Sequence, residues 1–97
     1  MIDNDTIHSR PRFLILVILS SVDECNFKFL KEKLEFTDGV LSVHLTKLEE
    51  AGYVKAVKSY LNKRPNSVYS LTQNGQKALL EYVEEMESLF EIIKESL

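Results

Sequence analysis

Cysteine is almost absent from this sequence, and long apolar runs are absent altogether. The single Cys25 has no partner for an internal disulfide and excludes a zinc site built from several cysteines. The longest apolar run, Phe13 to Leu19, has seven residues and is too short to cross a bilayer. It also lacks the small-residue cleavage site of a secretory segment. We therefore expect a cytoplasmic protein with no membrane partner.

The residue groups that enzymes use are missing as well. The sequence has no glycine-rich phosphate loop, no cluster of histidine and cysteine, and no plausible pair of nucleophile and base. We expect no catalytic residues, no metal site and no cofactor. His44 lies beside a predicted apolar stripe and is interpreted as a packed or helix-bonded histidine. Cys25, next to Asn26 at a helix start, could have a lowered pKa, but a small, partly buried turn residue is the preferred interpretation.

Positive charge is scarce overall but is concentrated in one segment. The net charge of the 97 residues is -3, whereas DNA-binding domains are often basic throughout. Residues 51–72 nevertheless carry four cations and no acid, for a local charge of +4, and residues 73–97 carry -4. Salt screens charges beyond roughly 8–10 Å, so a polyanion would respond mainly to the local field. The charge pattern therefore allows DNA to dock at residues 51–72.

The first third of the chain predicts a flexible arm and two helices. Residues 1–9 are polar and aperiodic, and we expect them to be frayed. Ser9 can cap a helix over Pro11–Ser21, which is apolar almost all round and so must be buried on two sides. Its own core and a second subunit could provide these sides. After a turn at Asp23–Asn26, apolar residues recur at helical spacing. They are Phe27, Leu30 and Leu34.

The next helix, over about residues 37–51, has one apolar face and one polar face. Leu41, Leu45 and Leu48 share a face at the i, i+4, i+7 spacing, and Thr37 or Asp38 can cap the helix start. The opposite face carries two valines that suit thymine methyl groups, among polar side chains that can reach bases or phosphates. Alternatively, scattered surface valines need no explanation. The residues of this helix that we expect at DNA are Thr37, Asp38, Gly39, Val40, Ser42, Val43, Thr46 and Lys47.

A β-hairpin is predicted after this helix. Gly52 suits a helix-ending left-handed position, and β-prone segments follow at 53–58 and 68–72. The tip between them, about residues 60–66 within a wing of about 59–67, holds Lys63 and Arg64. These cations are expected to contact phosphates or a narrow minor groove. A solvated hairpin with its usual surface charges is the alternative.

The last segment, residues 73–97, predicts a long helix capped by Thr72. Apolar residues with a 4-3-4-3-4 spacing form a heptad seam. They are Leu79, Val83, Met86, Phe90, Ile93 and Leu97. The helix reaches beyond what a core of this size can cover, which favours a homodimer. The expected interface residues are Phe13, Val17, Tyr82, Met86, Leu89, Phe90, Ile93 and Leu97.

These motifs together resemble a known family. The run from Thr37 to Val54, the Lys-Arg-Pro at 63–65 and the pattern Tyr-x-Leu-Thr-x-x-Gly at 69–75 are similar to small winged helix-turn-helix transcriptional regulators, related to the multiple-antibiotic-resistance and arsenic-repressor groups. The resemblance covers about residues 10–95. It implies a mainly α fold with a small β-hairpin (α+β), a winged helix-turn-helix over 10–72 and a dimerisation helix over 73–97 on the same domain. It also implies a prokaryotic source.

The function implied by the resemblance is that of a homodimeric regulator of transcription, a repressor in our interpretation, bound to double-stranded DNA. The helix at 37–51 would enter the major groove, and the wing would contact the backbone or the minor groove. Two departures matter: the cysteine metal motif of the arsenic repressors is absent, and Leu61-Asn62 stands where relatives often carry glycine. The first removes metal sensing from the inference, and the second leaves the wing geometry open.

Two questions remain open at the level of sequence. Relatives often bind small molecules between the dimer helices and the winged domain, but two dimer helices offer little material for a roomy cavity. The effector is therefore unknown, and we expect occupancy to follow protein concentration. The rival hypothesis is a winged-helix module that binds protein without binding DNA, which the net negative charge supports.

Overall fold

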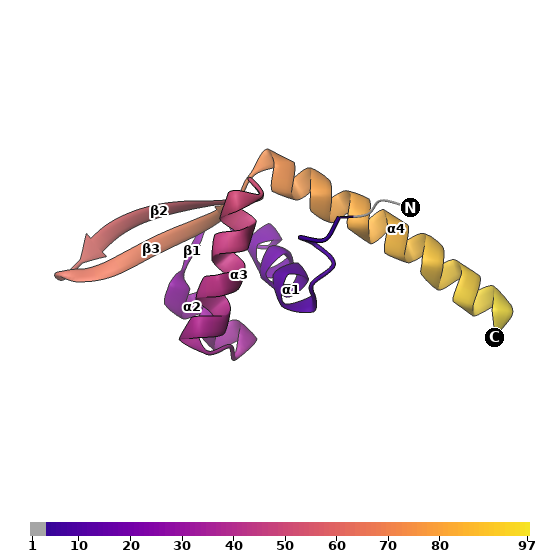
Figure 1. Ribbon diagram of the computed structural model, residues 1–97, viewed down its shortest axis with the longest axis horizontal. Helices are drawn as coiled ribbons and strands as arrows, with labels where there is room; N and C mark the ends of the chain where they lie inside the picture. The colour runs from indigo at the N-terminus through magenta and orange to yellow at the C-terminus, as the bar shows by residue number, and fades with distance from the viewer. Residues whose placement is uncertain (1–3) are drawn as a thin grey trace.

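Four helices and three strands make up residues 4–97, the part of the chain that the computed structural model describes. In chain order they are α1 (Arg10–Ser20), β1 (Cys25–Asn26), α2 (Phe27–Leu34), α3 (Asp38–Glu50), β2 (Val54–Leu61), β3 (Arg64–Leu71) and α4 (Gln73–Ser96). The strands form one antiparallel sheet in the order β1-β3-β2. The predicted α+β architecture, with a hairpin between the third helix and a long C-terminal helix, is confirmed (Figure 1).

The hydrophobic core lies where α1 meets the other helices and the base of the sheet. α1 contacts α2, α3, α4 and β3, so most of its apolar surface is covered within the chain, although Val17 is 40% exposed. The buried side chains of the core are Ile7, Ile15, Leu16, Leu19, Leu30, Leu41, Leu45, Leu48, Val54, Tyr69, Ala78 and Leu79. Burial of each large aliphatic side chain contributes about 1.5–3 kcal/mol, which fixes α2 and α3 on α1.

The N-terminal segment is folded, and the expectation of a frayed arm is wrong for residues 4–9. Ile7 is 1% exposed and belongs to the core. The amide of Asn4 closes the turn around it, since its Oδ1 atom accepts hydrogen bonds from the backbone nitrogens of Thr6 and Ile7, at 3.2 and 3.4 Å. One buried isoleucine in a polar stretch has no period, so pattern analysis missed it. Residues 1–3 lie outside the described residues.

The α2–α3 pair forms a helix-turn-helix whose ends are set by local capping. Asn26 caps α2 by accepting a hydrogen bond from Phe29 N at 2.9 Å. Glu35 ends α2 in the left-handed region, at φ 57°. Thr37, one of the two expected caps, starts α3 by accepting from Val40 N at 3.2 Å. The connection between the two helices is therefore short and fixes the direction of α3.

The wing formed by β2 and β3 is longer than predicted, and its tip is tighter. Pairing runs from Val54↔Leu71 to Leu61↔Arg64, so only Asn62 and Lys63 form the turn. Both have positive φ, at 52° and 65°, as a two-residue type I′ turn requires. The expected tip over residues 60–66 is therefore wrong. Asn62 tolerates the left-handed region, which permits pairing up to the turn without a glycine.

A third strand lies where the sequence predicted only a turn. Cys25 and Asn26 form β1 and pair with Tyr69 and Val68 of β3. Two residues are too few to show an alternating pattern. This short strand attaches the start of α2 to the wing, so the helix-turn-helix and the hairpin are directly connected.

α4 extends well beyond the rest of the molecule. Its 24 residues correspond to roughly 36 Å of helix, and the molecule measures 56 × 25 × 21 Å. Thr72 caps the helix as predicted, and the helix's buried residues, Gly75, Ala78 and Leu79, all lie in its first two turns. The C-terminal half projects away from the wing (Figure 1). Across residues 4–97, no helix combines the length and apolar character that a membrane span needs.

Candidate nucleic-acid interface

α3 is held to the core by one face and exposes the other. Leu41 and Leu48 are 0% exposed and Leu45 is 2% exposed, as their spacing predicted. At about 100° per residue, the opposite face must then point to solvent. Val40 and Val43 on that face are 42% and 55% exposed. The helix is thus firmly anchored while presenting a complete surface for contact.

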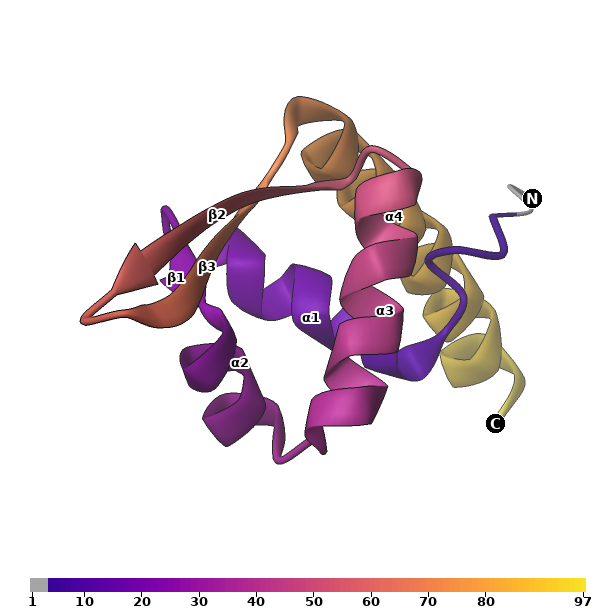
Figure 2. The same ribbon diagram turned by 60° about the vertical axis from the view of Figure 1, so that its left-hand side comes forward.

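Every residue that the sequence predicted at DNA is exposed. On α3 and its cap these are Thr37, Asp38, Gly39, Val40, Ser42, Val43, Thr46 and Lys47. On the wing, Lys63 lies in the tip turn and Arg64 is the first residue of β3. The two sets lie on different parts of the molecule. The wing extends to one side of α3, and α2 lies below the wing (Figures 1 and 2). This spacing suits contact with a groove and with a neighbouring stretch of backbone.

An ion pair neutralises the one acidic side chain at the start of α3. Lys31 Nζ lies 2.8 Å from Asp38 Oδ1 and thereby joins α2 to α3. The carboxylate also lies in the first turn of α3, where the helix dipole favours negative charge. Unpaired, it would repel a phosphate. The pair therefore makes the N-terminal end of α3 compatible with a polyanion.

The wing carries its cations on exposed positions along its whole length. Lys55 and Lys58 lie on β2, and Lys63 and Arg64 lie at the tip. Lys63 lies in the two-residue turn that joins β2 to β3, and this end of the wing projects away from the helices (Figure 1). The wing therefore provides a positive surface that reaches beyond α3.

An open groove between α2 and the wing was not predicted from the sequence. It has a volume of about 720 Å³ and is lined by Asn26, Phe27, Lys28, Leu61, Asn62, Arg64, Pro65, Asn66 and Ser67. Lys28 comes from α2 and Arg64 from β3, so cations flank it on both sides. Lys28 could not be predicted as a groove residue, because α2 is brought next to the wing by the pairing of the two-residue β1 with β3. No pattern in the sequence reveals that proximity.

His44 is half-buried on the side of α3 that faces α1. Its Nδ1 atom lies 3.1 Å from Arg12 Nη1, so the ring accepts this hydrogen bond in its neutral form. Burial lowers the pKa of His44, and the charges of Arg12 and Lys47 lower it further. The expectation of a packed histidine is confirmed. Across the described residues, no group of three or more His, Cys, Asp or Glu side chains could hold a metal ion.

Cys25 lies in β1 and is half-buried. Burial raises the pKa of its thiol, so the alternative of a lowered pKa is wrong. A thiol with a raised pKa is mostly protonated near neutral pH and is therefore weakly nucleophilic. The preferred interpretation, a small and partly buried residue, agrees with this position.

The residues predicted for a dimer interface fall into two groups. Phe13 and Tyr82 are half-buried and contact each other within the chain, with ring centroids 5.2 Å apart. Met86 and Leu89 are half-buried farther along α4. The more exposed apolar residues are Val17 at 40%, Phe90 at 49%, Ile93 at 51% and Leu97 at 100%. The C-terminal half of α4 therefore carries most of the uncovered seam.

Comparison with known proteins agrees with this geometry. The uncharacterized protein MJ0432 of Methanocaldococcus jannaschii is 40% identical over 79 residues, which cover 81% of this chain and 86% of that protein. The transcriptional regulator homologue protein from Pyrococcus horikoshii OT3 has a similar structure, with a TM-score of 0.86 at 22% identity, covering 94% of this chain and 90% of that one. A PadR family transcription regulator from Clostridium difficile R20291 gives a TM-score of 0.76 at 17% identity, covering 90% and 97%. At these identities the two structures establish the fold alone. Residues 12–90 match the winged helix DNA-binding domain, and this chain belongs to that family.

Proposed function

We propose that this protein is a sequence-specific regulator of transcription that binds double-stranded DNA as a homodimer. The observation that carries the proposal is the exposed face of α3 beside a cationic wing. In this arrangement α3 enters the major groove, where Val40 and Val43 can contact thymine methyl groups. Lys63 and Arg64 contact the adjacent backbone or the minor groove. Family membership and the regulators of similar structure support this function.

We propose that the protein represses transcription. Occupation of a site that overlaps a promoter blocks other proteins by exclusion, and it requires no surface beyond the DNA-binding one. A reporter gene placed behind a bound sequence tests this: repression predicts lower expression when the protein is present. Higher expression would contradict it.

The uncovered apolar surface of α4 supports the proposed homodimer. Phe90, Ile92 and Ile93 are each about half exposed, and Leu97 is fully exposed. A second copy of this chain is the proposed partner because the heptad seam is self-complementary, as two-fold symmetric helix pairing requires. Two linked winged domains would read a pseudo-palindromic site.

A protein-interaction module is the second candidate function. The wing exposes Val57 at 52%, Tyr60 at 78% and Leu61 at 61%, which is unusual for a surface used only for phosphate contact. The net charge of -3 points the same way. In that case the wing would dock on a protein partner.

A salt titration with random-sequence duplex DNA separates the two candidates. For a DNA-binding regulator, the logarithm of affinity should fall linearly with the logarithm of salt concentration, by about 0.9 per phosphate contact. Repeated selection from a random library should then enrich one pseudo-palindromic sequence. No binding at low salt would contradict the regulator and favour the interaction module.

We also propose that occupancy follows protein concentration through the dimer equilibrium and that no dedicated effector is involved. A thermal-shift screen of metals, aromatic acids and metabolites tests this proposal. A compound that raises the melting temperature and also releases DNA would contradict it.

A further inference from the structure

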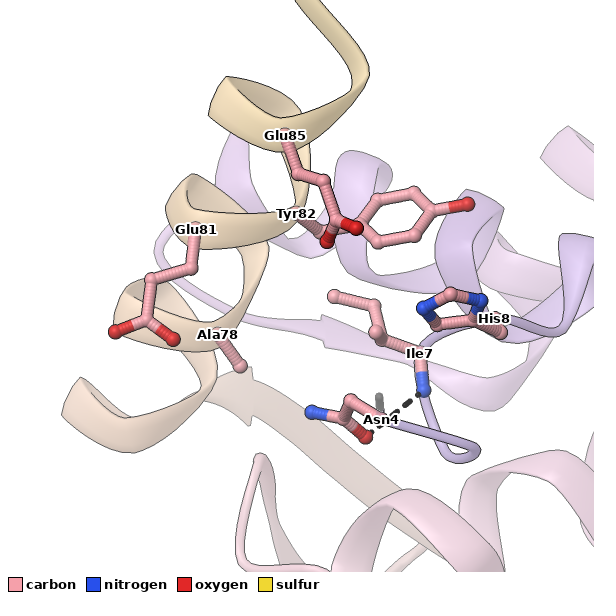
Figure 3. A pocket seen from close by; sticks show the side chains of 7 residues that line it. All are labelled: Asn4, Ile7, His8, Ala78, Glu81, Tyr82 and Glu85. Carbon is pink, nitrogen blue, oxygen red and sulfur yellow. Dashed lines mark hydrogen bonds between the residues drawn. The ribbon is translucent and has the colours of Figure 1, made fainter. Parts of the chain in front are cut away.

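The N-terminal segment, residues 4–8, contacts both the residue that precedes β2 and the middle of α4. Asn4 Nδ2 donates a hydrogen bond to Tyr53 Oη at 2.7 Å, next to the base of the wing. On the other side, the His8 ring lies against Tyr82 of α4, with centroids 5.2 Å apart in an edge-on arrangement. Figure 3 shows Asn4, Ile7 and His8 facing Ala78 and Tyr82 of α4. The space left between them is about 10 Å³, room for about one water molecule.

Arg12 joins this segment to α3, the helix that is proposed to enter the major groove. From α1, its guanidinium donates to Thr6 O from Nε at 2.6 Å and to Asp5 O from Nη2 at 3.1 Å. Its third nitrogen, Nη1, donates to Nδ1 of His44 on α3 at 3.1 Å. One side chain thus connects the N-terminal segment and α1 to α3, which is distant from both in the sequence.

The hydrogen bonds of Arg12 give α3 a directional restraint that its apolar contacts do not provide. Packing of Leu41, Leu45 and Leu48 holds α3 on the core, but apolar contacts are non-directional. Hydrogen bonds weaken steeply when their geometry is lost, so a planar guanidinium with three bonds restrains rotation and sliding of the helix. A small displacement of a recognition helix moves its side chains out of register with base edges.

We propose that Arg12 is a positioning residue, which sets the orientation of α3 for sequence reading by fixing His44 to the N-terminal segment and, through that segment, to α4. This inference rests on the proposed function in DNA binding. Arg12 does not itself contact bases. It acts through His44 and determines discrimination between sequences more than affinity for phosphates.

Protonation of His44 provides a way to break this connection. Nδ1 can accept from Arg12 only when it carries no proton, and an imidazolium would repel the guanidinium. The charged groups around the ring are Arg12 from α1 and Lys47 on α3, with Asp5 and Glu50 lining the same surface hollow as these two. Acidification should therefore reduce sequence discrimination. It should not reduce non-specific affinity, because the added positive charge favours phosphate.

The test compares affinity for two duplexes, one selected from a random library by the unmodified protein and one unselected. Arg12→Met keeps the aliphatic stem but removes all three donors. It should lower the ratio of the two affinities by about tenfold and leave the affinity for unselected DNA within about twofold. Arg10→Met is the matched control, since Arg10 is an exposed arginine of the same helix that makes no side-chain hydrogen bond within the described residues. It should leave the ratio unchanged.

A pH series provides a second measurement that does not depend on the folding of the Arg12 variant. Because the pKa of His44 is lowered from the ordinary 6.5, the ratio for the unmodified protein should be constant above pH 6.5 and should fall as the pH is lowered below it. His44→Gln offers Arg12 an acceptor that cannot be protonated, so its ratio should be maintained and independent of pH. A flat profile for the unmodified protein, or an Arg12→Met variant that folds and keeps the full ratio, would overturn the inference.

Failure of the proposed function has a different result. In that case the unmodified protein would bind no duplex at low salt, and no sequence would be enriched. Failure of the inference alone would leave selection and salt dependence intact while Arg12→Met discriminates as well as Arg10→Met.

Discussion

Thr46 and Lys47 on α3 differ from Lys63 and Arg64 on the wing in what they can read from a duplex. Phosphates carry little sequence information, so Lys63→Ala with Arg64→Ala should weaken binding to all duplexes alike and flatten the salt dependence. Thr46→Ala or Lys47→Ala should instead change the preference between sequences, by about 1–3 kcal/mol for each lost base contact. A titration against selected and unselected duplexes measures both effects. If both sets of variants keep full affinity and preference, the groove assignment is wrong.

Gly75 lies where the Tyr53 carbonyl, from the connection between α3 and β2, crosses the start of α4. A Cβ atom there would clash with Tyr53 O and approach Leu71 Cδ1 to 2.7 Å. Thr72 N already donates to the same carbonyl at 3.0 Å, so the carbonyl cannot move freely. We expect Gly75→Ala to lower the free energy of unfolding by about 3 kcal/mol, measured by urea denaturation.

Gly39 is the control for this substitution. It also lies in the first turn of a helix, but nothing lies within 4 Å of its virtual Cβ. Gly39→Ala should be neutral or stabilising by about 0.5–1 kcal/mol, because alanine loses less backbone entropy. Equal effects at the two positions would show that the close approach at Gly75 is not the cause.

His44 should make stability depend on pH. Its pKa is lowered in the folded protein from the ordinary 6.5, by burial first and then by Arg12 and Lys47. The unfolded chain therefore takes up the proton at a higher pH than the folded chain, and the free energy of unfolding falls as the pH drops from 6.5 through the lowered value. Above 6.5 the contribution is complete. Urea denaturation at several pH values should show this slope in the unmodified protein and a smaller one in His44→Gln. Equal slopes would contradict the assignment.

At the scale of elements, Thr72 connects the end of α3 to the start of α4. Its Oγ1 accepts from Gly75 N at 2.9 Å and donates to Gly52 O at 2.6 Å. Thr72→Val keeps the shape but removes both bonds, so we expect a loss of about 1–2 kcal/mol in the free energy of unfolding. Thr72→Ser retains the hydroxyl and should lose little. A valine variant as stable as the serine variant in thermal denaturation would exclude this role.

The elements with a clear period could be predicted from the sequence. The leucine spacing of α3 identified its buried face, and Thr72 and Gly52 marked the ends of helices correctly because their roles are local. The Asn4 turn, the two-residue β1 and the extra length of the wing could not be predicted. Each depends on contacts between distant residues, such as Cys25 with Tyr69. Lys28 and Arg12 could not be predicted as site residues for the same reason. Their roles depend on distant residues, Arg64 across the groove from Lys28 and His44 beside Arg12.

At the scale of the whole molecule, the two signs of charge lie at opposite ends. The wing end carries the cations of residues 51–72, and the α4 end combines a net charge of -4 over residues 73–97 with the uncovered seam (Figure 1). DNA would be repelled from the α4 end and attracted to the wing. The α4 end can therefore pair with a second copy, and the wings of both copies remain available for DNA.

The dimer itself gives the last prediction. Phe90→Glu or Ile93→Glu would place an unpaired carboxylate in the apolar seam, so each should dissociate the dimer. Light scattering should then give the molar mass of a monomer. Leu80→Glu is the matched control, because Leu80 is 58% exposed on the same helix but outside the seam, and it should leave the dimer intact. DNA affinity should fall when the dimer is lost, since two linked winged domains gain from effective concentration when they bind two half-sites. A monomer mass for the unmodified protein would reject the dimer. A split dimer that keeps full DNA affinity would show instead that one winged domain suffices for binding.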